Sequence, residues 1–376
     1  MGWITTEQAL ERLGTKPQTL YANVSRGRIA AKPDPADPRR RLYSTEDIDR
    51  LANRHQGRRK AETVAAESIA WGEPVLSTAI STIQDGHLLY RGIEAAVLSR
   101  TADLEGVAAL LWGGEPQHFA SKDTITNTGL PQAFAILAHL AATDMPSLGR
   151  GAAVLQREAA QVVGAVALAL AGPTDPELPT HDRVARHWQR PEAADIIRRA
   201  LVLLAEHELN ASTFSARVTV STGAPLSAAV LSGLCTLSGP LHGGAAAAME
   251  ELVASTQRLG PERAVQLNLR QGRALPCFGH RLYPHGDARA NELLGCFEVT
   301  PLYRELAAAG EALVGERPNI DFALAAMAAA FALPPAAPLI LFALARTVGW
   351  LAHALEQHET GSLIRPRARY VGPAPY

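Results

Sequence analysis

The sequence predicts a mainly α-helical protein with a small basic module at its N-terminus. Alanine dominates the apolar residues, which make up 47% of the 376 residues, and aromatic residues are only 5%. Small side chains that favour helices allow those helices to pack closely. The first 60 residues contain 13 Lys and Arg against 7 Asp and Glu, whereas the remainder contains 23 against 30. The chain is therefore a basic module joined to an acidic body, and its length predicts two or three domains.

The cysteines and the apolar stretches indicate the compartment. Cys235, Cys277 and Cys296 are odd in number and have no metal-ligand spacing, which argues against a disulfide framework. The chain begins without the apolar core of a secretory leader, so we expect a cytoplasmic protein. Residues 322–345 are uncharged and long enough for a membrane span, but three prolines interrupt them. Two buried helices joined by a kinked connection are the better interpretation, without a membrane partner.

Within the basic module, turn and capping residues predict a compact series of elements. Thr5 or Thr6 can cap a first helix that runs to about Leu13. A second helix is expected over residues 16–26, followed by an extended basic hairpin over residues 29–43. Ser44 and Asp47 then resemble a capping box that starts a third helix. Residues 55–60 are the expected linker.

This order of elements is similar to the winged helix-turn-helix of the MerR-like class, over residues 1–55. The resemblance implies base contacts from one set of side chains and phosphate contacts from another. The first set is Gln18, Thr19, Tyr21 and Ser25, and the second is Arg26, Arg28, Arg39, Arg40 and Arg41. DNA is then a partner of residues 1–55. The alternative is a small protein-docking module, or a relic of a DNA-binding domain, because a net charge of +6 is modest for a DNA reader.

The body begins at about Thr63 and opens with a hairpin. Residues 77–92 alternate in polarity and turn at Asp85-Gly86, which is typical of two paired strands. Helices are expected over residues 103–112 and 131–142, with a break at residues 127–130 between them.

His207 follows a run of apolar residues at helical spacing over residues 196–204, and the spacing predicts that it lies on the same helix face. On this evidence alone, such a histidine is more often a core residue that hydrogen-bonds the backbone. The sequence Glu-Leu-Asn-Ala-Ser-Thr that follows it favours a binding role instead.

A glycine-rich turn at residues 238–244 places His242 just before a helix expected from Ala245. The positive end of a helix dipole disfavours an imidazolium there. A neutral imidazole can donate an N–H group to a developing oxyanion, which assists enolisation. The alternative is a histidine that only caps the turn.

The loop at residues 276–289 combines two prolines, two glycines, two histidines and two arginines. Such a composition predicts a constrained loop that presents polar groups to an anion. Arg289 can clamp a carboxylate, and His280 can protonate a keto oxygen. Cys277 as a nucleophile is disfavoured, since no base is paired with it.

Two further charged residues lie in apolar surroundings. Asp321 precedes a helix expected over residues 322–333, where it either complements the helix dipole or serves as a base. Arg346 shares a face of the last long helix with Leu339, Phe342, Gly349 and His353. A buried guanidinium needs an anion, which is either a structural carboxylate or a substrate carboxylate.

Six segments together resemble the citrate synthase family, in that family's order and over about residues 70–376. They are His207-Glu-Leu-Asn-Ala-Ser-Thr, Gly239-Pro-Leu-His-Gly-Gly-Ala, Cys277-Phe-Gly-His-Arg-Leu-Tyr with Asp287-Ala-Arg-Ala, Asn319-Ile-Asp-Phe, the run from Ala343 to His353, and Arg365-Pro-Arg. The resemblance implies an all-α fold with a large domain at residues 63–242 and 331–376 and a small domain at residues 243–330. Residues 56–62 link this body to the basic module.

The resemblance also implies an acyltransferase that condenses acetyl-CoA with oxaloacetate and hydrolyses the product to citrate and CoA. Asp321 is then the base, His242 the donor to the enolate oxygen and His280 the acid. Substrate-binding residues are His207, Arg289, Arg346 and Arg365, the last reaching into the partner's site of a homodimer. Phe278, Gly279 and Arg281 are implied to bind CoA, with no permanently bound cofactor and no metal.

Two departures from the family pattern are visible, since Ala246 stands where Asn is common and Cys277 where the first loop glycine is usual. Donor size is set by packing, so three alternatives stay open. They are a 2-methylcitrate synthase that uses propionyl-CoA, a citryl-CoA lyase-like enzyme, and a DNA-binding regulator that senses CoA esters or oxo acids.

Overall fold

A computed structural model describes residues 3–13, 20, 23–24, 29–34, 37, 41–45, 47–48 and 76–373, except 122, 124, 126, 174, 176, 369 and 371. The chain divides into two compact units, Met1–Ser77 and Thr78–Tyr376. Each is described by itself. Several predictions for this part of the chain lie outside the described residues. They are the linker at residues 55–60, the start of the body at Thr63, and all but three positions of the second helix at residues 16–26. Of the proposed DNA contacts, only Arg41 is described.

The first unit contains helix α1 (Thr6–Leu13) and three short strands, β1 (Trp3–Ile4), β2 (Ala31–Pro33) and β3 (Arg41–Ser44). Thr5 accepts a hydrogen bond from the N–H of Gln8, which confirms the expected helix start. The strands form one antiparallel sheet in the order β1-β3-β2, so the expected extended hairpin is present. Its small core includes Ala9, Leu20, Ile29, Tyr43 and Ile48.

The second unit opens with a small antiparallel sheet of β4 (Ser81–Gln84), β5 (His87–Tyr90) and β6 (Ile93–Glu94). Asp85 and Gly86 both have positive φ, at 52° and 80°, which is the geometry of a tight two-residue hairpin turn. The expected hairpin is therefore confirmed. The two small sheets are an exception to the predicted all-α fold. Their strands are too short to carry a core, so they have little effect on the amino-acid composition.

The rest of the second unit is helical, as the composition predicts. The helices are α4 (Ala95–Leu98), α5 (Leu104–Trp112), α6 (Leu130–Thr143), α7 (Ala152–Ala171), α8 (Thr180–His187), the 3₁₀ turn η1 (Pro191–Ala193), α9 (Ala194–Leu204), α10 (Ala211–Ser221), α11 (Leu226–Leu237), α12 (Pro240–Gly243), α13 (Ala245–Leu259), α14 (Pro261–Arg270), α15 (Ala288–Leu294), α16 (Pro301–Val314), α17 (Ile320–Ala330) and α18 (Ala337–Thr360). The helices expected at residues 103–112 and 131–142 correspond to α5 and α6. The prolines after residue 333 separate α17 from α18, as expected.

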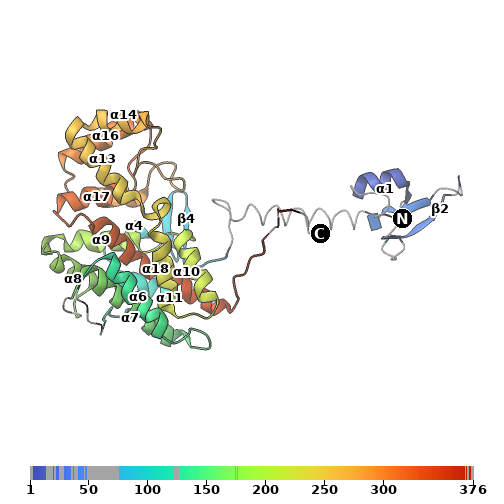
Figure 1. Ribbon diagram of the computed structural model, residues 1–376, viewed down its shortest axis with the longest axis horizontal. Coiled ribbons are helices and arrows are strands. Elements are labelled where there is room, and N and C mark those ends of the chain that lie inside the picture. Colours follow the sequence, from blue (N-terminus) through green and yellow to red (C-terminus); the bar gives the residue numbers. More distant parts are fainter. Residues whose placement is uncertain are drawn as a thin grey trace. The chain divides into compact units, whose positions relative to one another are not determined.

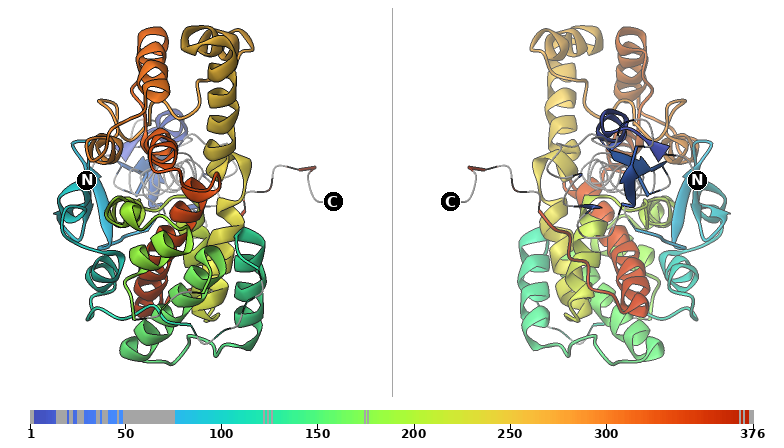
Figure 2. Two further views of the ribbon diagram at one scale, coloured as in Figure 1. Left: turned by 90° about the vertical axis from the view of Figure 1, so that its left-hand side faces the viewer. Right: turned by 90° about the vertical axis from the view of Figure 1, so that its right-hand side faces the viewer.

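The larger of two cores surrounds α18. Helices α5, α7, α9, α10 and α11 pack against it, and both views of the ribbon show it running through the body (Figure 1, Figure 2). The close approach depends on glycine, since a Cβ at Gly233 would lie 2.7 Å from the ring of Trp350. Helices α7 and α18 have the length and apolar composition of membrane spans, but 67% and 89% of their apolar windows are buried inside the protein. They are explained as core helices.

A smaller core joins α13, α14, α16 and α17. Met249, Leu252, Val265, Leu306 and Phe322 are among its buried members. These helices lie at the end of the unit opposite α6, α7 and α11 (Figure 1). Helices α15 and α17 contribute residues to both cores, with Phe322 in the smaller one and Leu324 in the larger. Side chains that project from α17 therefore stand where the two cores meet.

Candidate active site

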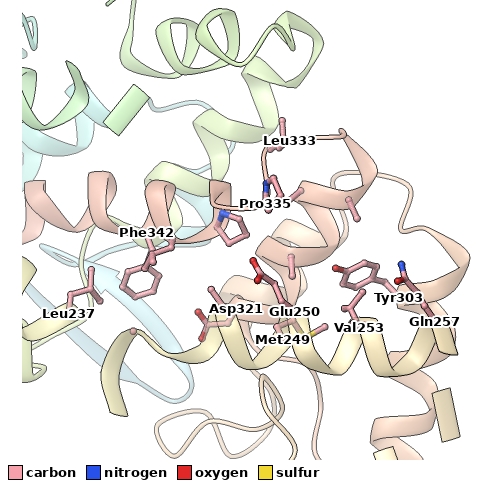
Figure 3. Close-up of a pocket in the computed structure, with 18 of the residues that line it drawn as sticks. Leu237, Met249, Glu250, Val253, Gln257, Tyr303, Asp321, Leu333, Pro335 and Phe342 are labelled. Carbon is pink, nitrogen blue, oxygen red and sulfur yellow. The ribbon is translucent and has the colours of Figure 1, made fainter. Parts of the chain in front are cut away.

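A cavity of about 300 Å³ brings His242 and Asp321 together, although 79 positions separate them in the sequence. Its walls come from α13, α17 and the start of α18. Figure 3 shows Asp321 near Glu250 and Met249, with Phe342 and Leu237 to one side and Tyr303 to the other. Two of the three residues proposed as catalytic thus face one space.

His242 occupies the short turn α12, between two longer helices. The turn requires glycine at both following positions, because a Cβ at Gly243 would lie 2.1 Å from the carbonyl oxygen of Leu237. A Cβ at Gly244 would lie 2.3 Å from that of Pro240. The glycine pair therefore allows α11, α12 and α13 to fold back tightly and to aim His242 at the cavity.

The side chain of His242 is fixed by Ser212, with 2.9 Å between Nε2 and Oγ. The Ser212 oxygen accepts the indole N–H of Trp350, and its own proton goes to Oδ1 of Asn210 or to His242. When Ser212 donates to Nε2, the ring proton of neutral His242 resides on Nδ1 and is available to an oxyanion. Ser212 was part of the sequence motif, but the motif did not reveal this contact.

The pKa of His242 is lowered to about 4, first by burial and then by the positive charge of Arg346. The sequence predicted the neutral ring correctly but attributed it to a helix dipole. The structure assigns the main effect to burial of the ring, which disfavours the charged imidazolium.

Asp321 lies in the first turn of α17, which begins at Ile320, two residues before the predicted start at residue 322. Asn319 caps the helix, and its Oδ1 accepts the N–H of Asp321 at 3.1 Å. Burial raises the pKa of the Asp321 carboxyl, and Asp287 acts in the same direction, whereas Arg289 and Arg346 oppose it. A carboxylate with a raised pKa is a stronger base, so the setting suits proton abstraction.

A second cluster contains His207, His280 and Tyr283. The ring centroids of the two histidines are 5.2 Å apart, and Nε2 of His207 lies 2.9 Å from the hydroxyl of Tyr283. Helix α9 ends at Leu204, so His207 follows the helix instead of sharing its face as predicted. It belongs to a buried segment in which Glu208 has a positive φ of 51°. Tyr283 was absent from the predicted site.

Both histidines of this cluster are held neutral. Burial, then the charges of Arg289 and Arg346, keep the pKa of His207 well below its ordinary value. Burial and Arg289 lower the pKa of His280 to about 4. Nδ1 of His280 accepts the N–H of Leu282 at 3.2 Å, so the neutral ring carries its proton on Nε2. His280 is therefore a hydrogen-bond donor toward the site.

Arg289 is paired within the chain, which corrects the expected free carboxylate clamp. Its Nε and Nη2 bind the two oxygens of Asp287 at 2.9 and 2.8 Å. Asp287 also accepts the N–H of Ile320 at 3.0 Å, and the pair is almost fully buried. Asp287 precedes Arg289 by two residues in the turn that starts α15, and this short reach favours the pairing. Both N–H groups of Nη1 and the second N–H of Nη2 remain for an incoming anion.

Arg346 lies on α18, buried, with its guanidinium 4.7 Å from the ring of Phe342. Nε donates to the carbonyl of Leu204 at 3.1 Å, and no carboxylate of the described residues forms an ion pair with the side chain. Glu206 contributes a nearby negative charge. Since a buried guanidinium without an anion is costly, Arg346 is prepared for an anionic group.

Behind Arg346 lies a buried polar network that the sequence did not indicate. A Cβ at Gly349 would lie 2.4 Å from the carbonyl of Ala205, so α18 lies directly against the segment before His207. Oε1 of Glu206 is 3.1 Å from Nε2 of His353, and both are fully buried. Ser81 donates to Glu206, and Arg217 binds Glu356 and Gln357 on the far side of His353. The network fixes the two elements that carry His207 and Arg346.

The remaining predicted residues lie elsewhere. The ring of Phe278 packs on the smaller core, with its centroid 5.4 Å from that of the Phe322 ring. A Cβ at Gly310 would lie 2.3 Å from the Phe278 ring. The N–H of Gly279 donates to Arg317 and its carbonyl accepts from Asn319. The side chains of Arg281 and Arg365 are exposed. Within one chain, the structure does not bring these residues to the cavity.

The two departures from the family pattern have different surroundings. Ala246 lines the cavity close to His242. Cys277 is buried with a positive φ of 63°, a conformation that favours glycine. Burial and Asp321 raise the pKa of its thiol, so it stays protonated and is a poor nucleophile. Among the described residues no three His, Cys, Asp or Glu side chains form a metal site.

Comparison with known proteins adds an independent observation. Residues 69–367 match the family model of the citrate synthase C-terminal domain. The chain is 40% identical over 210 residues to "Putative citrate synthase 2" of Mycobacterium tuberculosis, covering 51% of this chain and 56% of that protein. It is 30% identical over 354 residues to the 2-methylcitrate synthase of Shewanella oneidensis, covering 81% and 94%. With the mycobacterial protein and several other curated relatives, the chain matches only about half of their length.

Solved structures share the fold. The citrate synthase of Thermotoga maritima superposes with a TM-score of 0.66 at 24% identity, over 82% of this chain and 97% of that one. A structure from Thermoplasma acidophilum, described as a ternary complex of citrate synthase with carboxymethyl coenzyme A and oxaloacetate, gives 0.65 at 23% identity, over 81% and 95%. The helical architecture described above is therefore an established one.

Proposed function

Because the chain belongs to the citrate synthase family, we propose that it joins the α-carbon of acetyl-CoA to the keto carbon of oxaloacetate and hydrolyses the thioester to citrate and CoA. One observation carries the proposal. A base of raised pKa, Asp321, and a neutral imidazole, His242, face the same cavity. Such a pair suits enolisation of a thioester, which needs a base at the α-carbon and a donor at the carbonyl oxygen.

The second cluster suits the oxo acid. In the proposed reaction, Nε2–H of His280 donates to the ketone oxygen that the enolate attacks. Arg346, Nη1 of Arg289 and His207 then hold the carboxylates, with Arg365 of a second copy as a further cation. Burial of these groups strengthens each electrostatic interaction and excludes water until the carbon–carbon bond has formed.

The CoA moiety is proposed to lie along the loop of Phe278, Gly279 and Arg281. The ring of Phe278 is half-buried and packs against Phe322 of the smaller core. We place the boundary of a large domain at residues 63–242 and 331–376 and that of a small domain at residues 243–330. The two cores support this division, and closure of the smaller one over the oxo acid would complete the site.

A homodimer in the cytoplasm is part of the proposal. Arg365 is exposed and distant from the cavity of its own chain, so it would act in a partner's site. Large apolar side chains at Met145, Leu148 and Leu363 are 68%, 77% and 58% exposed, which supports association. Sedimentation of the full chain tests this directly.

The decisive experiment is release of free thiol from acetyl-CoA or propionyl-CoA, with and without oxaloacetate. Release that needs oxaloacetate and is lost in Asp321→Asn establishes the condensation, and the preferred donor separates a citrate synthase from a 2-methylcitrate synthase. Formation of acetyl-CoA and oxaloacetate from citryl-CoA, without release of free thiol, would indicate a lyase-like enzyme. No release from any of these thioesters contradicts the proposal.

A regulatory function is the second candidate, because the first unit pairs a helix with a basic antiparallel hairpin. Lys32 and Arg41 lie on β2 and β3 of that hairpin. A winged helix-turn-helix that binds DNA would let the body act as a sensor of CoA esters or oxo acids. A gel-shift titration of the full chain against a pool of two-fold symmetric DNA sites, at two salt concentrations, tests it. Absence of salt-sensitive, sequence-specific binding removes this candidate.

A further inference from the structure

The cavity that contains Asp321 is larger than an acetyl group requires. It continues from His242 and Asp321 along α17 and α13 to Tyr303, as Figure 3 shows. The volume of about 300 Å³ is at the lower end of the range of small-molecule sites. The part beyond Asp321 has no role in the condensation described above.

The walls of this extension are mostly apolar, with the exposed side chains of Glu250 and Gln257 and the hydroxyl of Tyr303 as polar members. Ala246 and Ala325 leave space next to Asp321, and Met249, Val253 and Leu333 continue the surface. Alanine at the wall positions is what creates the volume, since each longer side chain there would fill it. An apolar space of this kind excludes charged groups and favours alkyl groups.

The position of the base decides what enters the extension. Asp321 must contact the α-carbon whose proton it removes, so any alkyl group on that carbon also lies beside Asp321. Asp321 lines this cavity together with Ala325 and Met249. The chain of a longer acyl group is therefore directed between α13 and α17, away from the oxo acid held by Arg346 and His207.

We propose that the same site also accepts, and prefers to acetyl-CoA, an acyl-CoA thioester with an unbranched alkyl chain longer than propionyl, and that the chain occupies this extension. The inference rests on the proposed condensation and specifies its donor. Asp321 takes one proton from the α-carbon, the α-carbon forms a bond to the ketone carbon, and the resulting alkoxide is protonated. Water then cleaves the thioester, giving a carboxylate and the free thiol of CoA. The product is a citrate that carries the alkyl chain on its new carbon.

The open end of the extension limits the chain further. Gln257 stands at this end, whereas Glu250 lies on the wall near Asp321, and both side chains are exposed. A carboxylate at the end of an acyl chain would meet the negative charge of Glu250, so succinyl-CoA is disfavoured. A methyl end instead lies among Val253, Ala254 and Tyr303.

The test is a donor series with oxaloacetate at saturation: acetyl-CoA, propionyl-CoA, butyryl-CoA, hexanoyl-CoA and succinyl-CoA. Each methylene withdrawn from water contributes roughly fourfold in binding. We expect kcat/KM for butyryl-CoA and hexanoyl-CoA to exceed that for acetyl-CoA by about tenfold or more, and succinyl-CoA to be a poor donor. Mass spectrometry of the products verifies that the alkyl chain is retained.

Filling the extension gives the matched comparison. Ala325→Leu narrows it next to Asp321, and Ala329→Leu narrows it at an exposed position that tolerates a larger side chain. Each should lower the ratio of hexanoyl-CoA to acetyl-CoA turnover by about tenfold. Ala247→Leu is the control, because Ala247 is exposed on α13 and does not line the cavity. Ala247→Leu should leave the ratio of hexanoyl-CoA to acetyl-CoA turnover unchanged. If Ala325→Leu does not fold, Ala329→Leu alone tests the inference.

The outcomes separate the two levels of the argument. Turnover of acetyl-CoA or propionyl-CoA without turnover of the longer donors overturns this inference and leaves the condensation intact. An unchanged donor ratio in both filling variants also overturns it. Absence of thiol release with every donor overturns the condensation and this inference together.

Discussion

Nε2 of His242 lies 2.9 Å from Oγ of Ser212, and the indole N–H of Trp350 donates to the same oxygen. The serine is 30 residues before the histidine, on α10, and its hydroxyl holds the ring of His242 in place through Nε2. A residue that does not touch the substrate thus prepares the donor for the enolate oxygen.

Replacing Ser212 with alanine tests this relationship. Without the hydroxyl, neutral His242 loses the hydrogen-bond partner that fixes its ring at Nε2, so we expect kcat for thiol release to fall by about 10- to 100-fold. KM for the acyl-CoA should change little. Ser215→Ala is the control, since Ser215 lies on the same helix and its hydroxyl contacts only the hydroxyl and the carbonyl oxygen of Ser232. An equal fall of kcat in both variants would show that any substitution on α10 lowers activity, and would contradict a specific role for Ser212.

Removal of the Tyr283 hydroxyl should act on the oxo acid. Tyr283 is 1% exposed and its hydroxyl orients His207. In Tyr283→Phe the imidazole is free to turn, and we expect KM for oxaloacetate to rise about tenfold, with a smaller change for the acyl-CoA. Steady-state kinetics with each substrate varied in turn measures the two constants. A rise confined to the acyl-CoA would contradict the assignment of His207 to the oxo acid.

The Glu206 carboxylate should be a large contributor to stability. Burial acts to raise its pKa, but His353, Arg346 and Ser81 hold the pKa below the usual value. Glu206→Gln removes the negative charge that His353 and Arg346 face, and we expect the free energy of unfolding to fall by about 3 kcal/mol. Glu94→Gln breaks the exposed pair with His87 and should change it by less than about 1 kcal/mol. Urea unfolding of both variants distinguishes the two effects, and similar losses would contradict the buried role.

Thiol labelling should divide the cysteines into two classes. Cys235 and Cys296 are exposed, whereas Cys277 is buried and its pKa is raised by burial and by Asp321. We expect two of the three thiols to react with Ellman's reagent in the native protein and the third only after unfolding. Rapid reaction of all three, with activity lost in step, would instead indicate an accessible Cys277.

Acid should destabilise the protein through His242 and His280. Both have a folded pKa of about 4, below the ordinary value of 6.5, so the unfolded state binds more protons between these limits. The contribution of these two histidines to the free energy of unfolding is complete above pH 6.5 and is lost as the pH falls toward 4. Urea unfolding across this window should show a decreasing free energy of unfolding. His242→Gln and His280→Gln should each flatten the slope, and an unchanged slope in both would exclude them as its cause.

The sequence predicted much of this protein from short-range patterns. Apolar spacing and capping residues located α5, α6 and α9 to within a few residues, and the turn at Asp85-Gly86 located the hairpin. The motifs identified His242, His280 and Asp321 as candidates, because the chemistry of a residue and its immediate neighbours is a local property.

The error at His207 shows where such patterns end. The apolar spacing continued through Leu204, but the backbone leaves the helix there, and Glu208 adopts a positive φ. Packing of α18 against the carbonyl of Ala205 determines this path, and it depends on a glycine more than 140 residues away. Periodicity within one segment carries no information about such a contact.

What the sequence determined by itself is the identity of the reactive side chains and the helices that carry them. Tertiary structure alone decided their partners: Ser212 for His242, Tyr283 for His207, Glu206 beside Arg346, and the cavity beyond Asp321. It also assigned Arg289 to Asp287 rather than to a free clamp. The reason is that pKa, tautomer and cavity shape depend on burial and on charges that converge from distant segments, which only the folded chain brings together.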